Sequence, residues 1–155
     1  MLDLTADIID VRDIIERIEE LEGELEEAHE QGQFMSDFDD WITNTRDNSR
    51  PVYAALGDEQ GKEVVAGCEE LFKLRELMDK LRGYGGRRHW RGDWYPLTLI
   101  RDSYFTDYAR ELLEDCGVLP KDLPSYIEID WEATACNIQQ DYASVKVDGD
   151  TYWYR

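Results

Sequence analysis

The sequence predicts an α+β fold in which an N-terminal acidic helical hairpin packs on a small C-terminal antiparallel sheet with two helices. Apolar residues recur at heptad spacing in two long stretches of the first half. Aromatic and β-branched residues become frequent after the glycine-rich run at 83–86, and an Asp-Gly pair near the end separates two alternating segments. We divide the chain into an acidic helical region, 1–86, and an α/β region, 87–155, which together form one compact unit.

The first predicted helix runs from about Thr5 to about His29, with Thr5 as its N-cap. Ile8 and Ile15 widen its apolar stripe on one flank, which favours packing in a bundle over a strict two-stranded coiled coil. The stripe occupies the a and d positions of a heptad repeat, which are Leu4, Val11, Ile14, Ile18, Leu21, Leu25 and Ala28.

A short helix and a second long helix complete the predicted hairpin. Ser36 followed by Asp39 resembles a capping box and opens the short helix, and the segment 48–51 ends it. The long helix runs from about Asp58 to Leu81 and stops at the run Gly83-Tyr84-Gly85-Gly86. Because both long helices carry heptad stripes, we expect them to pack antiparallel.

Caps and alternation predict the elements of the α/β region. Two helices are expected, one that begins at Asp102 or Ser103 and ends at Gly117, and one that Asp130 caps. Extended segments are expected at Leu97–Ile100, around Ile127 and Ile129, and in a C-terminal hairpin that turns at Asp148-Gly149.

The charge of the chain is its most unusual property. The 36 Asp and Glu outnumber the 17 Lys and Arg and leave a net charge of -19, whereas small soluble domains typically carry a magnitude of roughly 2 to 8. Such a chain is expected to bind neither nucleic acid nor an anionic membrane, because both are polyanions. We therefore expect a basic protein partner.

The acids are also segregated along the chain. Residues 1–40 hold 15 acids and 2 bases, residues 41–100 hold 9 acids and 10 bases, and residues 101–155 hold 12 acids and 5 bases. Adaptation to high salt would spread acids evenly, so the near-neutral middle argues against it. A partner that reads a local acidic surface explains the segregation better.

Several chemical classes lack a motif in this sequence. Cys68, Cys116 and Cys136 are widely spaced, and the two histidines, His29 and His89, are isolated in sequence from each other and from the cysteines, so no metal site or cofactor is expected. No nucleophile elbow occurs, and we predict that the protein is not an enzyme. The start of the chain has no leader composition and no long apolar run follows, which predicts a cytoplasmic protein.

Two motifs near the middle of the chain allow more than one interpretation. The glycines at 83–86 follow a predicted helix, so they suit a helix end better than a phosphate-binding loop, which would follow a strand. The basic-aromatic run Arg87–Arg91 is typical of a nucleic-acid patch. In a chain with this net charge, the same run is equally consistent with a contact to a protein partner and with neutralisation of carboxylates of the protein itself.

The acidic helix has the linear charge density of a nucleic-acid strand. The stretch from Asp3 to Glu30 holds 12 acids, and as a helix it covers about 40 Å at roughly 1.5 Å per residue. That gives one carboxylate per roughly 3.4 Å, the spacing of charges along a single DNA strand. The candidate partner-binding acids of this helix are Asp13, Glu16, Glu19, Glu20, Glu22, Glu24, Glu26 and Glu27.

Three C-terminal strings carry a resemblance to a known family. WYPLTLIRDSYFTDYARELLEDCG (Trp94–Gly117), IDWEATACNIQQDY (Ile129–Tyr142) and the closing VDGDTYWYR are similar to ArdA-type antirestriction proteins of phages and mobile elements. The resemblance implies a DNA mimic that blocks the DNA-binding sites of Type I restriction-modification enzymes, in the host cytoplasm if a phage encodes it. The acids that match are Asp107, Glu111, Glu114, Asp115, Asp130 and Glu132.

Two hypotheses of function follow from the sequence. In the first, the protein occupies the DNA-binding groove of a host defence protein, either a restriction-modification enzyme or a CRISPR effector, and acts as a homodimer. The acidic helices lie outside the resemblance, which leaves the target open. In the second, the protein is a non-catalytic interaction or assembly module that pairs through residues such as Ile18 and Leu25, and its charge serves only solubility.

Overall fold

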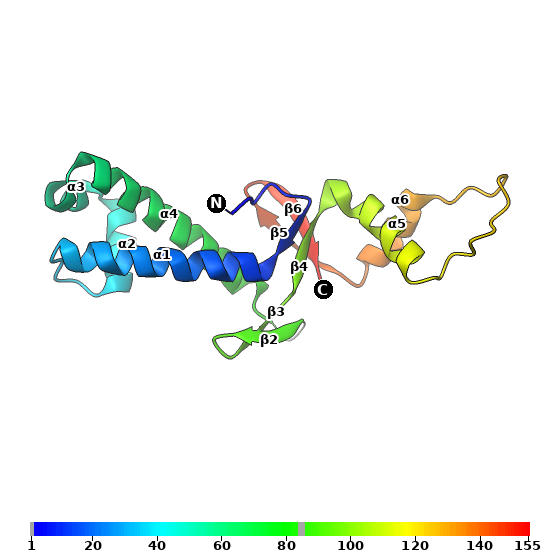
Figure 1. The fold of residues 1–155 in the computed structure, drawn as a ribbon, viewed down its shortest axis with the longest axis horizontal. Coiled ribbons are helices and arrows are strands. Elements are labelled where there is room, and N and C mark those ends of the chain that lie inside the picture. The colour runs from blue at the N-terminus through cyan, green and yellow to red at the C-terminus, as the bar shows by residue number, and fades with distance from the viewer. Residues whose placement is uncertain (1, 84–85) are drawn as a thin grey trace. The chain divides into compact units, whose positions relative to one another are not determined.

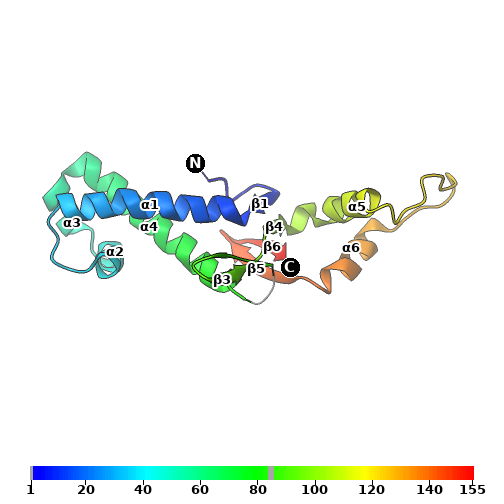
Figure 2. The same cartoon turned by 60° about the horizontal axis from the view of Figure 1, so that its bottom comes forward.

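The structure, a computed structural model, describes residues 2–83 and 86–155, apart from the side chain of Arg88. The α+β fold with an N-terminal helical region is confirmed (Figures 1 and 2). The chain forms two compact units, a helical unit of residues 12–80 and a sheet unit made from the described residues of 1–11 and 81–155. This division differs from the predicted boundary at residue 86, because the first strand pairs within the sheet unit.

The helical unit contains α1 (Val11–Gln31), α2 (Phe38–Asp47), α3 (Arg50–Leu56) and α4 (Asp58–Leu81). Helices α1 and α4 are antiparallel, since Arg17 bonds Glu70 whereas Gln31 bonds Gln60 (Figure 1). The predicted hairpin and both ends of α4 are confirmed, and Tyr84 and Gly85 of the predicted stop signal lie outside the described residues. The heptad stripe of α1 from Val11 to Ala28 is at most 5% exposed and forms part of the core.

The predicted start of α1 at Thr5 is wrong. Residues Ile8–Asp10 form a strand, β1, which pairs antiparallel with β4 (Thr98–Arg101). The hydroxyl and the backbone N–H of Thr5 both donate to Asp3 Oδ1 at 2.6 and 2.8 Å, so Thr5 sits in a local turn and caps no helix. The β-branched isoleucines of β1 fit a half-buried strand, and pairing with β4 gives their backbone groups partners that a helix start would leave unpaired.

The predicted start signal of α2 is also corrected. No capping box forms at Ser36, because Asp37 is the N-cap residue of α2 and its side chain makes no cap hydrogen bond. The Ser36 carbonyl oxygen lies 2.8 Å from His29 Nε2. The segment 48–51 ends α2 as expected, yet Pro51 then stands in the first turn of α3. A proline is tolerated there, because the N–H that it lacks has no partner in the first turn of a helix.

The sheet unit is built on a four-stranded sheet of order β1-β4-β6-β5, in which all neighbours are antiparallel. Its C-terminal hairpin joins β5 (Ala143–Val147) to β6 (Asp150–Tyr154). Asp148 and Gly149 both have positive φ, 49° and 89°, as a two-residue type I′ turn requires. The predicted hairpin is therefore confirmed.

The structure contains a second hairpin, β2 (Arg87–Trp90) with β3 (Asp93–Tyr95), which the sequence did not predict. Its turn residues, Arg91 and Gly92, have φ values of 48° and 80°, again the type I′ pattern. The basic character of the segment concealed the strand signal, because arginine is not enriched in strands whereas the aromatic residues beside it are.

Helices α5 (Phe105–Asp115) and α6 (Trp131–Gln139) pack together in the sheet unit. Asp130 caps α6 as predicted, since its Oδ1 accepts from the Ala133 N–H at 3.0 Å. Gly117, at a φ of 67°, follows α5 as predicted. A single 3-10 turn, η1 (Asp102–Tyr104), leads into α5. The N-cap residue is Arg101 for η1 and Tyr104 for α5, so neither Asp102 nor Ser103 is the predicted cap. Residues 127–129 belong to no strand.

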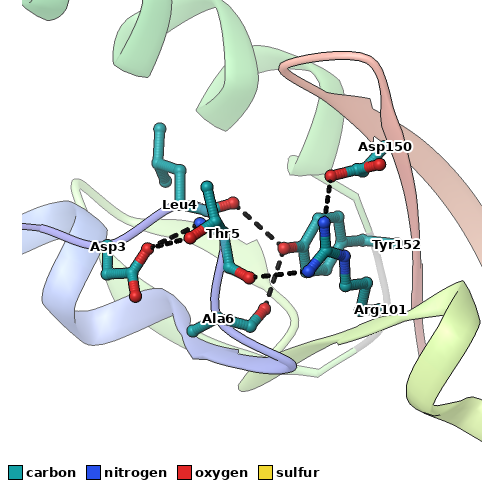
Figure 3. Close-up of polar contacts among 7 residues, drawn as sticks. All are labelled: Asp3, Leu4, Thr5, Ala6, Arg101, Asp150 and Tyr152. Atoms are coloured by element: carbon teal, nitrogen blue, oxygen red, sulfur yellow. Dashed lines mark hydrogen bonds and ion pairs between the residues drawn. The ribbon is translucent and has the colours of Figure 1, made fainter.

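The sheet holds the N-terminal segment through two side chains (Figure 3). The Tyr152 hydroxyl, on a fully buried side chain, lies 2.8 Å from the Ala6 carbonyl oxygen and 3.0 Å from that of Leu4. Burial raises the pKa of Tyr152. Arg101 donates to the Thr5 carbonyl oxygen at 3.0 Å and also binds the Asp150 carboxylate. These contacts fix the segment that precedes β1.

The substitution Tyr152→Phe should lower the free energy of unfolding by about 1–2 kcal/mol, because it removes a hydroxyl on a buried side chain whose partners are the half-buried carbonyl groups of Leu4 and Ala6. Urea unfolding followed by circular dichroism measures the change. The matched control is Tyr154→Phe, two residues along the same strand on a half-buried side chain, and it should change the stability by less than about 0.5 kcal/mol. Equal losses in the two variants would contradict the assignment of Tyr152 as the anchor.

Candidate partner-binding surface

Helix α1 presents a continuous row of carboxylates opposite its buried stripe. Five acids follow one another at intervals of three or four residues, the spacing that places side chains on one helix face. They are all exposed. We call this set the acidic row, and its members are Asp13, Glu16, Glu20, Glu24 and Glu27.

A second line of acids, Glu19, Glu26 and Glu30, flanks the acidic row and is also exposed. With Glu22, the 21 residues of α1 therefore hold nine acids. A helix of this length measures about 30 Å at roughly 1.5 Å per residue, so it carries one carboxylate per about 3.3 Å, against roughly 3.4 Å for one DNA strand. The later start of the helix leaves the predicted charge density unchanged.

Two arginines tie part of this charge to the helical unit itself. Arg17 binds both oxygens of Glu70 at 2.9 and 3.0 Å and reaches Glu20 at 3.3 Å, and these bonds raise its pKa. Arg75 on α4 bridges Glu22 and Asp39 at 3.0 and 2.9 Å. The side chain of Glu22 is only 18% exposed. Of the predicted acids of α1, Glu22 thus contributes mainly to packing against α4.

The predicted acids of the C-terminal half gather on α5 and at the start of α6. All six are exposed. Asp107, Glu111 and Glu114 share one face of α5 at intervals of four and three residues, and Asp115 lies beside them. These acids belong to the sheet unit and those of α1 to the helical unit.

Three of these C-terminal acids also have local partners. Asp130 caps α6. Glu111 accepts from the Tyr104 hydroxyl at 3.1 Å, and Glu114 pairs with Arg110 at 3.1 Å. Because the Arg110–Glu114 pair is exposed on both sides, it stabilises little and can exchange for an outside partner.

The basic run Arg87–Arg91 forms one strand of the β2-β3 hairpin and its turn. The guanidinium of Arg91 lies 4.3 Å from the centre of the Trp90 ring. His89 Nε2 lies 3.2 Å from the Tyr95 carbonyl oxygen, and the Trp90 and Tyr95 rings are 5.7 Å apart. These contacts give the aromatic residues a structural use within the hairpin.

The three cysteines differ in burial. Cys68 is fully buried on α4, and its burial raises the pKa of the thiol to about 12. Cys116 and Cys136 are exposed. Within residues 2–83 and 86–155, no three His, Cys, Asp or Glu side chains are placed to hold a metal ion, and no helix has the length and hydropathy of a membrane span.

Comparison of the chain with protein-family models, with curated proteins and with solved structures finds no match. The resemblance to ArdA-type proteins therefore stays a hypothesis, and the function must be argued from the acidic surface itself.

Proposed function

We propose that the protein is a DNA-mimic inhibitor that binds the DNA-binding groove of a host defence protein and blocks access of DNA. The target would be a restriction-modification enzyme or a CRISPR effector. The observation that carries this proposal is the acidic row of α1, which with its three flanking acids places eight exposed carboxylates along about 30 Å of helix, one per about 3.8 Å, against roughly 3.4 Å for the phosphates of one DNA strand.

In the proposed mechanism, carboxylates of the protein replace the anions bound in a basic groove of the target. Asp and Glu side chains pair with Arg and Lys of the target through charge-assisted hydrogen bonds, which are stronger than neutral ones. The target groove releases the anions that it held, so binding weakens as salt rises. Because the core stripe and the Arg17–Glu70 pair hold α1 against α4, little conformational entropy is lost when the row meets its target.

The sheet unit supports the same class of function. Its acids on α5 and α6 are those that the ArdA resemblance implicates, and they are exposed. A homodimer would double the negative surface and match the two-fold symmetry of many DNA targets. We include dimerisation in the proposal.

A second candidate function is an interaction or assembly module. Ile18 and Leu25, the residues expected to pair with another helix, are 0% and 3% exposed in the chain's own core, so they offer no free stripe. A different observation favours an apolar contact: the segment between α5 and α6 exposes Val118, Leu123, Tyr126 and Ile127. Exposed apolar surface is a common feature of interaction sites when it is contiguous, and these four side chains lie within one ten-residue segment.

Competition with DNA tests the first proposal. A purified Type I restriction enzyme and a DNA-binding CRISPR effector are each bound to fluorescent duplex DNA, and the protein is titrated in. We expect displacement of DNA, with an apparent affinity that falls by about 10³-fold or more between 50 and 200 mM salt if six or more ion pairs form.

A polyglutamate of equal net charge is the control for the competition. It should displace DNA far less well, because it does not hold its carboxylates in a fixed array. A complex that forms without displacement of DNA would favour the assembly function instead, and absence of binding to both target classes would refute the inhibitor proposal.

A further inference from the structure

A groove runs between α1 and α4 at the end of the helical unit where α1 finishes. Its volume is about 310 Å³. It is lined by Glu24, Leu25, Glu27, Ala28 and Gln31 from α1 and by Gln60, Glu63, Val64 and Gly67 from α4.

The floor of the groove is apolar, and a glycine of α4 faces a leucine of α1 beside it. Leu25, Ala28 and Val64 are 3%, 5% and 7% exposed. Gly67 has no side chain to fill the space, and a Cβ atom at this position would lie 3.2 Å from Leu25 Cδ2. A larger residue at 67 would therefore crowd Leu25, so the close approach of the helices and the open groove depend on the same glycine.

Carboxylates stand on both sides of this floor. Glu24 and Glu27 come from the acidic row of α1 and Glu63 comes from α4, and all three are exposed. Among the described residues, no hydrogen bond or ion pair is formed by these three carboxylates, although the charge of Glu24 contributes to the raised pKa of Arg17. Gln31 and Gln60 close one end of the groove with two reciprocal amide hydrogen bonds of 3.4 and 2.8 Å.

An apolar floor between acidic walls complements a long side chain that has an apolar stem and a cationic head. Arginine fits better than lysine, because its planar guanidinium binds carboxylates through two parallel bonds and is less strongly hydrated. The three carboxylates are not placed to converge on a metal ion within the described part of the chain. The groove is at the lower limit of small-molecule sites, roughly 300 Å³, and suits one or two side chains.

We propose that this groove is the anchor site for an arginine side chain of the basic partner. The stem of the arginine lies on Leu25, Ala28 and Val64, and its guanidinium binds Glu63 opposite Glu24 and Glu27. This inference rests on the proposed function, since it names the partner residue that the acidic surface selects. It adds Glu63, which the row of α1 does not contain, to the residues that bind the partner.

A titration followed by NMR of the full chain tests the site. The probe is N-acetyl-arginine amide, and N-acetyl-citrulline amide is its neutral counterpart of the same shape. We expect saturable shifts of the Gly67 backbone amide and of the Gln31 and Gln60 side-chain amides with the arginine compound alone. Glu63→Gln should weaken binding by about tenfold, the loss of one charge-assisted bond.

The matched control is Glu69→Gln, an exposed position on α4 that does not line the groove. It should bind the arginine compound as the wild type does. Three results would overturn the site: no saturable shift at Gly67, equal shifts with citrulline, or equal losses in the two variants. A lysine analogue that binds as tightly as arginine would also overturn the arginine assignment.

The two proposals fail separately. If the arginine compound binds in the groove but the protein displaces no DNA from either target class, the anchor site stands and the inhibitor proposal falls. If DNA is displaced while Gly67 shows no shift and Glu63→Gln competes as well as the wild type, the inhibitor proposal stands and the anchor site falls.

Discussion

Neutralising the acidic row should weaken binding to the target by about a thousandfold at physiological salt. The variant carries Asp13→Asn with Glu16→Gln, Glu20→Gln, Glu24→Gln and Glu27→Gln. Exposed ion pairs are worth up to about 1 kcal/mol each, and tenfold in affinity corresponds to about 1.4 kcal/mol. The slope of the logarithm of the binding constant against the logarithm of salt concentration should also decrease, by the amount that up to five ion pairs contribute. DNA competition at several salt concentrations measures both changes.

The control for this variant removes the same charge elsewhere in the helical unit. Five acids outside α1 are neutralised by the substitutions Asp40→Asn, Asp47→Asn, Glu59→Gln, Glu69→Gln and Glu76→Gln. If the row is the binding site, this control should bind almost as the wild type does. If both variants weaken equally, only total charge matters. The free energy of unfolding should change little in either variant, because every substituted residue is exposed.

The sequence predicted best the elements that carry their own start and stop signals. Helix α4 has a heptad stripe that stops before the glycine-rich run at 83–86, α6 has Asp130 as its cap, and the C-terminal hairpin has an Asp-Gly turn. Each signal is local, so no knowledge of the remaining fold is needed. The acidic row belongs to the same class, since its spacing on a helix can be counted directly from the sequence.

Elements that depend on distant partners were missed. Ile8–Asp10 is too short for alternation to differ from a helical stripe, and its strand exists because β4 lies beside it, about 90 residues later. The pairing of Glu22 with Arg75 and the placement of Glu63 opposite Glu24 also join residues of different helices. Two missed elements did have local signals: Pro51 in the first turn of α3 and Arg91-Gly92 in the turn of the second hairpin.

The substitution Phe105→Ala should have the largest effect on stability. Phe105 is fully buried between α5 and the sheet, in a cluster with Ile100, Ala109 and Ala135. Its ring lies 5.5 Å from that of Tyr108, 5.3 Å from Tyr142 and 6.3 Å from Trp153.

Removing the Phe105 ring should cost about 3–5 kcal/mol, because the rings around it cannot all move to fill the cavity. That is a large part of the roughly 5–15 kcal/mol that stabilises a typical domain. Urea unfolding measures the loss, and Phe105→Leu, which keeps most of the volume, should cost less than about 1.5 kcal/mol. Because Asp107 and Glu111 follow Phe105 on α5, loss of this packing should also disorder the acids that the resemblance implicates. A loss below about 1 kcal/mol for the alanine variant would contradict the packing of α5 against the sheet.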